Sequence, residues 1–292
     1  MLQYYFFAIK LVETIFNILM VVLLLPRNIF TKIVNKKDAG VVHIFGNGPS
    51  LKIDIDKIIS RLKESKEDQV MAVNSFASDP LFELLQPSYY ILVDPVYFED
   101  SQLDRIKLLK VKLSNSLLKK TSWPLNLFVP VSANKSEFVQ DLSKNKNIKV
   151  FYFKNSPVIG GSQRINNFLF KNNLANPLYQ NVLMAGIFLS LKIGFSKIRI
   201  WGADHSWHEG FELRKDNNIY ILDEHFYSDQ NNTAFLNCNA DGVPNRVHEE
   251  FLRLSRVFKI YHSLESFSKY INSEIINLSS KTWIDAFKRD DK

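Results

Sequence analysis

The stretch 41–59 constrains the fold of this chain more than any other. It opens with the apolar run Val41–Phe45, continues through a turn with two glycines and a proline, and ends in residues whose apolar members recur at helical spacing. This order predicts a buried strand, a tight turn and the start of a helix, because glycine permits positive φ and proline suits a first helical turn. In such a unit the N–H groups of the turn point at an anionic ligand.

We therefore expect a nucleotide phosphate to bind at this turn. The residues that would hold it are Gly46, Asn47, Gly48, Pro49 and Ser50. Leu51 stands where the dinucleotide-binding fingerprint Gly-x-Gly-x-x-Gly has its third glycine, so the turn is neither that fingerprint nor a P-loop. Gly-Asn-Gly also suits an ordinary tight turn, and this alternative stays open.

Segments with the patterns of strands and helices alternate along the rest of the chain. Short apolar runs predict further strands at 69–73, 89–93, 125–131, 149–153, 197–201 and 274–278. Helices are predicted at 101–120, 182–191, 247–272 and 282–288. This alternation is typical of an α/β protein with a doubly wound, mostly parallel, Rossmann-like sheet.

Length and composition predict one catalytic domain over residues 38–292. The chain has 292 residues, of which 46% are hydrophobic, so it can bury a large core. Polar segments around 154–178 and 205–245 interrupt the alternation and are predicted to be lids over the site. The single cysteine, Cys238, excludes an intrachain disulfide framework and a cysteine zinc site, and favours a reducing compartment.

Polar residues stand at the ends of four predicted strands. They are Asn47, Asn74, Asp94 and Asp204. In a doubly wound sheet, ligands bind beyond the carboxyl ends of the strands, so we expect these side chains to face one crevice. Asparagine and aspartate are also common turn formers at strand ends, which is the alternative for each of them.

Asp204 opens the cluster Asp204-His205-Ser206-Trp207-His208. A metal site needs about four ligands, so we expect hydrogen bonding and stacking against a substrate here, with Trp207 as the platform. A histidine on a surface loop is the alternative. His248 opens the predicted helix 247–272, and a neutral imidazole there can accept a proton. We therefore expect His248, Asp204 and His205 to be catalytic, with no required cofactor or metal.

Residues 1–30 differ from ordinary globular sequence. An apolar run extends from Tyr4 to Leu25 and ends at Pro26. At 100° per residue, the polar residues fall on one helical face: Gln3, Lys10, Glu13, Thr14 and Asn17. Lys10 and Glu13 would each cost roughly 2.5–3.5 kcal/mol at mid-bilayer, so we predict an amphipathic helix at a membrane interface or in one leaflet. Packing of this helix on the chain's own core or in a homo-oligomer is the alternative.

The charge of the chain agrees with an anionic partner. The formal net charge is +7, which fits a nucleotide, an anionic lipid or a nucleic acid. No nucleic-acid-binding motif or basic stripe is visible, so nucleic acid is not expected. Basic residues follow the apolar helix directly: Arg27, Lys32, Lys36 and Lys37. They would favour anionic headgroups and keep the following domain on the cytoplasmic side of a membrane.

Together these segments resemble the bacterial sialyltransferases of glycosyltransferase family 42 and related enzymes of lipopolysaccharide and capsule synthesis. The resemblance covers about 41–287. It is carried by Ile44–Leu51, by Val73–Phe76 and by the block 184–204, in which an apolar helix, Gly194, a strand and Gly-x-Asp follow in order. It implies a GT-A-like sheet of the sialyltransferase type, on the cytoplasmic face of the bacterial inner membrane.

The resemblance also implies an activity, the transfer of a CMP-activated sugar of the sialic acid or Kdo type to a lipopolysaccharide, capsule or other glycan acceptor. The positions it places near the nucleotide-sugar, together with those expected above, are Gly46, Asn47, Gly48, Pro49, Ser50, Asn74, Ser75, Asp94, Asn181, Gly202 and Trp207. His248 takes the place of the family's catalytic histidine. The sheet and loop also resemble hydroxymethylpterin diphosphokinases, so a diphosphotransferase is one alternative, and a non-catalytic nucleotide-binding membrane protein is another.

Overall fold

A computed structural model of the chain describes residues 2–24, 39–99, 104–222, 234–239 and 242–289. Its centre is an eight-stranded sheet in the order β13-β12-β8-β1-β2-β3-β4-β5, in which every pair of neighbours is parallel. The strands are β1 (Val41–Phe45), β2 (Gln69–Val73), β3 (Tyr89–Ile91), β4 (Leu125–Pro130), β5 (Ile148–Phe153), β8 (Lys197–Trp201), β12 (Glu274–Asn277) and β13 (Lys288–Arg289). The predicted doubly wound α/β sheet is confirmed.

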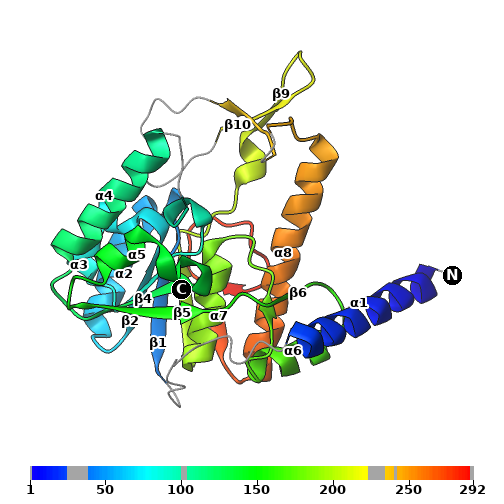
Figure 1. The fold of residues 1–292 in the computed structure, drawn as a ribbon, viewed down its shortest axis with the longest axis horizontal. Helices are drawn as coiled ribbons and strands as arrows, with labels where there is room; N and C mark the ends of the chain where they lie inside the picture. The colour runs from blue at the N-terminus through cyan, green and yellow to red at the C-terminus, as the bar shows by residue number, and fades with distance from the viewer. Residues whose placement is uncertain (1, 25–38, 100–103, 223–233, 240–241, 290–292) are drawn as a thin grey trace.

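Helices cover both faces of this sheet (Figure 1). One face packs against α6 (Gln163–Lys171), α7 (Val182–Ile193) and α8 (Val247–Tyr270), and the other against α2 (Ser50–Glu64), α3 (Leu81–Leu85), α4 (Asp104–Lys120) and α5 (Glu137–Leu142). Alternate residues of each strand enter the two cores: in β2, Met71 and Val73 join the first, and Val70 and Ala72 join the second. This alternation follows from the two-residue period of a strand.

α7 is apolar on all sides because it lies between the sheet and α8. Apart from Lys192, all of its residues are buried. The helix begins at Asn181, whose side chain accepts a hydrogen bond from the Met184 N–H, and it ends at Gly194, which has a φ of +105°. An amide cap at the start and a left-handed glycine at the end are ordinary helix boundaries, and both could be predicted from the sequence.

The order of the strands reverses between β1 and β8. The chain runs outward through β1, β2, β3, β4 and β5, then returns to the other side of β1 with β8 and continues to β12 and β13. In doubly wound sheets this reversal is the point at which ligands bind, because the connections leave in opposite directions and open a crevice at the carboxyl edge. The turns after β1 and β8 therefore share the expected site.

The first segment predicted to be a lid, 154–178, lies elsewhere. It contains β6 (Pro157–Val158), α6 and β7 (Asn176–Pro177), and Val158, Leu169 and Phe170 are buried in the first core. The second segment, 205–245, contains the short helix η4 (Trp207–Gly210) and a small sheet of β9 (Phe211–Leu213), β10 (Ile219–Ile221) and β11 (Phe235–Leu236). Residues 223–233 and 240–241 of this second prediction are outside the described residues.

The predicted helix 282–288 is wrong. Residues 278–287 form no helix, and the segment instead bonds to the turn after β8. The Trp283 N–H donates to the Asp204 carbonyl at 2.9 Å, and the Thr282 hydroxyl donates to the Ala203 carbonyl at 2.6 Å. These long-range bonds satisfy groups that a helix would have paired locally, so the tertiary structure overrides the local pattern.

The N-terminal apolar run forms α1 (Leu2–Leu24), whose N-terminal end extends away from the rest of the molecule (Figure 1). Its C-terminal half contacts the loop before α6 through polar side chains. No helix among the described residues is both long and apolar enough to cross a membrane. The expected helix is present, and the remainder of the range predicted for it, residue 1 and residues 25–30, is outside the described residues.

Candidate functional site

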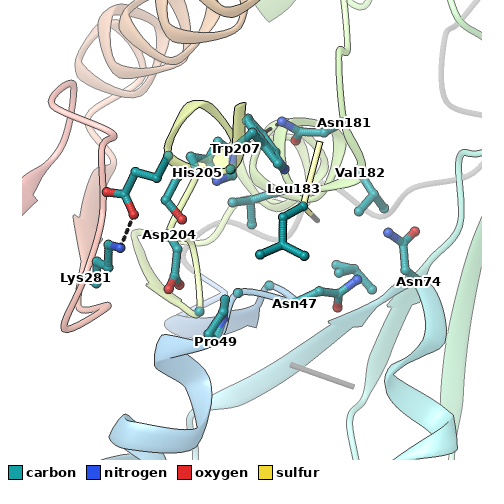
Figure 2. A pocket seen from close by; sticks show the side chains of 18 residues that line it. Asn47, Pro49, Asn74, Asn181, Val182, Leu183, Asp204, His205, Trp207 and Lys281 are labelled. Atoms are coloured by element: carbon teal, nitrogen blue, oxygen red, sulfur yellow. Dashed lines mark hydrogen bonds and ion pairs between the residues drawn. The ribbon is translucent and has the colours of Figure 1, made fainter. Parts of the chain in front are cut away.

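A cavity of about 350 Å³ lies at the carboxyl ends of β1, β2 and β8. Most of the predicted site residues line it: Gly46, Asn47, Gly48, Pro49, Asn74, Asn181, Gly202, Asp204, His205 and Trp207. Figure 2 shows Asn47 and Asn74 on one side, His205, Trp207 and Asn181 on the opposite side, and the Leu183 side chain between them. The tertiary structure therefore brings together predicted residues that lie as far apart in the sequence as Gly46 and Trp207.

Four predicted site residues do not line this cavity. They are Ser50, Ser75, Asp94 and His248. Asp94 is exposed and caps the short helix η2 (Pro95–Tyr97) by accepting a hydrogen bond from the Val96 N–H. The Ser75 hydroxyl lies 3.4 Å from the Tyr97 hydroxyl. His248 is exposed on the first turn of α8, so its catalytic role stays a prediction from the sequence.

We expected the N–H groups of the glycine turn to hold a phosphate, and for most of them this prediction is wrong. The Gly46 N–H donates to the Trp201 carbonyl and the Gly48 N–H to the Gly202 carbonyl, each at 2.8 Å. The Ser50 N–H donates to Asp204 at 2.9 Å. These donors join the turn after β1 to the turn after β8, so they cannot also hold a phosphate. Among the described residues, only the Asn47 N–H of this turn has no hydrogen-bond partner.

Asp204 holds the start of α2. One carboxylate oxygen accepts from the Ser50 N–H, and the other accepts from the Ser50 hydroxyl at 2.5 Å. A carboxylate at a helix N-terminus is stabilised by the unpaired N–H groups there. Burial raises the pKa of Asp204, and the bonds from Ser50 oppose this rise. Asp204 therefore keeps the two turns together, and its catalytic role stays a prediction from the sequence.

Asn47 and Asn74 each present an unsatisfied oxygen. The Oδ1 atoms of both side chains are buried, and neither has a hydrogen-bond partner among the described residues. A buried amide oxygen without a partner costs roughly 1–3 kcal/mol, so a donor on a bound ligand would stabilise these two atoms. Both atoms accept hydrogen bonds and cannot donate, so a complementary ligand supplies hydroxyl or amino groups at these two points.

His205 belongs to a partly buried hydrogen-bonded group with Asn181 and Tyr261. Its Nε2 atom lies 2.5 Å from the Tyr261 hydroxyl and 3.3 Å from the Asn181 Nδ2 atom. Asn181 caps α7 through Oδ1, which orients its Nδ2 donor toward the other two residues. We assign Nε2 as the acceptor of this group, which places the imidazole proton on Nδ1.

The charge state of His205 follows from its surroundings. Burial lowers its pKa to about 3, so the imidazole is neutral near pH 7. Burial also raises the pKa of Tyr261 well above its usual value, so that hydroxyl keeps its proton. Trp207 lies against His205 with ring centroids 4.4 Å apart. The cavity wall thus combines a neutral hydrogen-bonding imidazole with an indole ring.

Analysis of the sequence missed several residues of the site. Lys281 lines the cavity and forms an ion pair with Glu209, which also lines it (Figure 2). Tyr261 lies in the apolar stripe of α8 between Val257 and Leu264, so its pattern indicated a core residue. A tyrosine in a buried stripe needs a partner for its hydroxyl, and this was the available signal. Lys281 lies between the predicted strand 274–278 and the predicted helix 282–288, so no pattern in the sequence indicated its position.

Comparison with known proteins supports the fold. No protein-family model matches the chain, and no curated protein is significantly similar to it in sequence. A solved structure, the MAf glycosyltransferase from Magnetospirillum magneticum AMB-1, is similar to it with a TM-score of 0.51 and 11% sequence identity. The similarity covers 90% of this chain and 35% of that protein, so the chain spans about a third of its length.

Proposed function

We propose that this protein is a glycosyltransferase that moves a sugar from a nucleotide-activated donor to a glycan acceptor. The observation that carries the proposal is the cavity at the reversal of strand order, where Asn47 and Asn74 present two buried oxygens without partners. The glycosyltransferase with a similar fold supports the same class of activity. A nucleotide-sugar fits because its ribose and sugar hydroxyls are donors for both oxygens.

The donor that we propose is a CMP-activated sugar of the sialic acid or Kdo type. The charged residues that line the cavity are Asp204 and the ion pair between Glu209 and Lys281. These residues give the wall no excess of positive charge, which suits a leaving group with one phosphate better than a leaving group with two. Donors for this phosphate include the Asn47 N–H and the side-chain amides of Asn47 and Asn74, which line the cavity. A lipopolysaccharide, capsule or other glycan is the proposed acceptor.

In the transfer, the oxygen of an acceptor hydroxyl forms a bond to the anomeric carbon as the bond from that carbon to the phosphate oxygen breaks. CMP leaves, and the hydroxyl proton passes to its phosphate or to water. Negative charge then grows on the departing phosphate. The Nδ1–H of neutral His205 is a donor for this charge, because Tyr261 and Asn181 hold the Nε2 side of the ring. A neutral imidazole held in place before the reaction can stabilise an oxyanion without reorganisation.

The test is a thermal-shift series with CMP, UDP, GDP and ATP, each with and without Mg²⁺. We expect CMP to raise the melting temperature of the wild-type chain and to have much less effect on Asn47→Ala. Ser75→Ala is the matched control, because Ser75 neighbours Asn74 but does not line the cavity. A shift with ATP only in the presence of Mg²⁺ would favour the diphosphotransferase, and no shift with any nucleotide would contradict a nucleotide-sugar site.

A further inference from the structure

The polar stripe of α1 is turned toward the domain. Glu13 accepts a hydrogen bond from the Gly161 N–H at 2.7 Å, and the Thr14 hydroxyl accepts one from the Ser162 N–H at 2.8 Å. The Asn17 side chain donates to the Ile159 carbonyl at 3.2 Å. Thr14 and Asn17 are 6% and 3% exposed. The sequence predicts a polar face toward water or lipid headgroups, and the structure places that face against the loop 159–162.

This loop is shaped to receive the helix. Gly160 and Gly161 have φ values of +61° and +76°, which L side chains rarely adopt. A Cβ atom at Gly160 would overlap the Glu13 carboxylate, and one at Gly161 would lie 3.1 Å from the Thr14 hydroxyl oxygen. Both glycines thus allow the backbone to approach the polar stripe closely. The contact sets the rotation of α1 about its own axis.

With the polar stripe covered, the outward side of α1 is apolar. Large apolar side chains from Tyr4 to Leu23 have exposed fractions between 37% and 81%. At 100° per residue, these side chains cover an arc of roughly 220° around the helix. Ile159, in the loop that contacts α1, is a further exposed apolar residue at 61%. A surface helix of a globular protein has the opposite polarity, with its apolar face toward the core.

We propose that the interfacial region of a lipid bilayer covers this outward arc. A helix of 23 residues is roughly 34 Å long, so an inclined or flat α1 presents its apolar arc to acyl chains along this length. A second copy of α1 would cover a stripe only about 100° wide and would leave about half of the arc in water. A bilayer surrounds the whole arc at once.

The charges of α1 agree with a bilayer that has anionic headgroups. Glu13 faces the domain loop, so this carboxylate is kept away from the lipid. Lys10 lies within the polar stripe but is exposed, and its long side chain can extend toward the headgroups. The net charge of +7 attracts the whole chain to an anionic surface. This inference is independent of the proposed glycosyltransferase activity.

Flotation of the full chain with vesicles of phosphatidylethanolamine and phosphatidylglycerol tests the proposal. We expect the wild-type chain to float with the vesicles. The variant Val12→Ser, Phe16→Ser, Leu19→Ser should bind to vesicles at least roughly tenfold more weakly, because the centre of the arc loses apolar area. The matched control, Ile53→Ser, Leu84→Ser, Leu108→Ser, removes side chains that are 71%, 61% and 69% exposed on the domain, and it should float like the wild type.

The single variant Val12→Lys gives a second measurement, in case three serines unfold the helix. It places a charge at the centre of the arc and should also lower vesicle binding, with the melting temperature of the domain unchanged. A wild-type chain that stays with the free protein, or a serine variant that floats like the wild type, would overturn the proposal. A wild-type chain that sediments as a dimer and does not float would assign the arc to a second copy.

Discussion

Two residues of the cavity wall have positive φ, a backbone conformation that residues other than glycine rarely adopt. Asn74 and His205 have φ values of +50° and +54°. Each is held by a buried tyrosine: the Tyr90 hydroxyl donates to the Asn74 carbonyl at 2.5 Å, and the Tyr261 hydroxyl lies 2.5 Å from the His205 ring. Residues in left-handed conformations cluster at functional sites, where the surroundings compensate for their cost. At the scale of single residues, the site is therefore pre-organised.

The first prediction concerns the unsatisfied oxygen of Asn47. Asn47→Ala removes a buried acceptor without a partner, so we expect the free energy of unfolding without ligand to stay the same or to increase. Nucleotide affinity should fall about tenfold, the equivalent of ~1.4 kcal/mol. The control is Asn145→Ala, because the Asn145 side chain donates to the Leu118 and Thr121 carbonyls. This control should lose stability in urea unfolding and keep its affinity. The opposite pattern would contradict the binding role of Asn47.

The second prediction separates the two candidate imidazoles. His205→Phe removes the neutral donor of the cavity wall, and we expect kcat/KM with the nucleotide-sugar to fall about 100-fold or more. His248→Phe changes an exposed residue outside the cavity lining, and we expect a change of less than about threefold. Steady-state kinetics on both purified variants gives the answer. A large loss only in His248→Phe would restore the sequence-based hypothesis of a catalytic His248.

At the scale of elements, the turns after β1 and β8 form one unit. Two backbone hydrogen bonds and the Asp204 carboxylate join them, so the start of α2 depends on the position of β8. Gly46 lies at their closest approach, where a Cβ atom would overlap the Gly202 carbonyl oxygen. Gly202 itself has a φ of +64°. The glycines of the sequence motif thus serve backbone packing, while the asparagine between them faces the ligand.

The third prediction follows from this close approach. Gly46→Ala should lower the free energy of unfolding by about 2–3 kcal/mol, because backbone atoms of the turn after β8 must move away from the new Cβ atom. Gly186→Ala in α7 is the matched control. A Cβ atom there lies 3.3 Å from the flexible Met71 side chain, and alanine favours a helix, so we expect a change within about 1 kcal/mol. Urea unfolding of both variants measures the difference. Equal effects would show that the two turns do not restrict position 46.

At the scale of the whole molecule, the reversal of strand order decides where the site lies. The two cores pack independently on the two faces of the sheet, and the cavity opens at the edge where β1 and β8 end together. The middle of β1 carries another histidine, His43, which is fully buried. The Trp201 indole N–H donates to His43 Nδ1 at 2.9 Å, and His43 Nε2 lies 3.0 Å from Asp68. His43 and His205 both make folding sensitive to acid.

The fourth prediction is this acid sensitivity. Burial lowers the pKa of His43, with Arg199 adding to the effect and Asp68 opposing it, and burial lowers the pKa of His205 to about 3. Below about pH 6.5 the unfolded chain therefore binds more protons than the folded chain. The free energy of unfolding is at its full value above that pH and falls as the pH decreases. For His205 this fall continues to the folded-state pKa of about 3. Urea unfolding from pH 7.5 to 5 should show a loss of up to about 1.4 kcal/mol per pH unit for each histidine. His205→Gln should reduce this slope, and an unchanged slope would contradict the assignment.

The sequence alone determined the local elements of this protein. β1, β2 and β8 have the predicted boundaries, and α7 and α8 begin at the predicted residues. The order of strands and helices, with glycine turns after β1 and β8, was enough to predict the sheet and to place most lining residues at one edge. These features depend on side-chain periodicity and turn chemistry, which act over a few neighbouring residues and are therefore visible in the sequence.

Only the tertiary structure decided which polar atoms are free. The amides of the glycine turn, the carboxylate of Asp204 and the polar stripe of α1 all have partners more than 140 positions away, which leaves Asn47, Asn74 and His205 to face the cavity. The sequence could not show this, because each hydrogen-bonding group takes whichever partner the packed chain brings within about 3 Å. Distant segments meet only after the sheet has formed, and their pairing then determines what remains for a ligand.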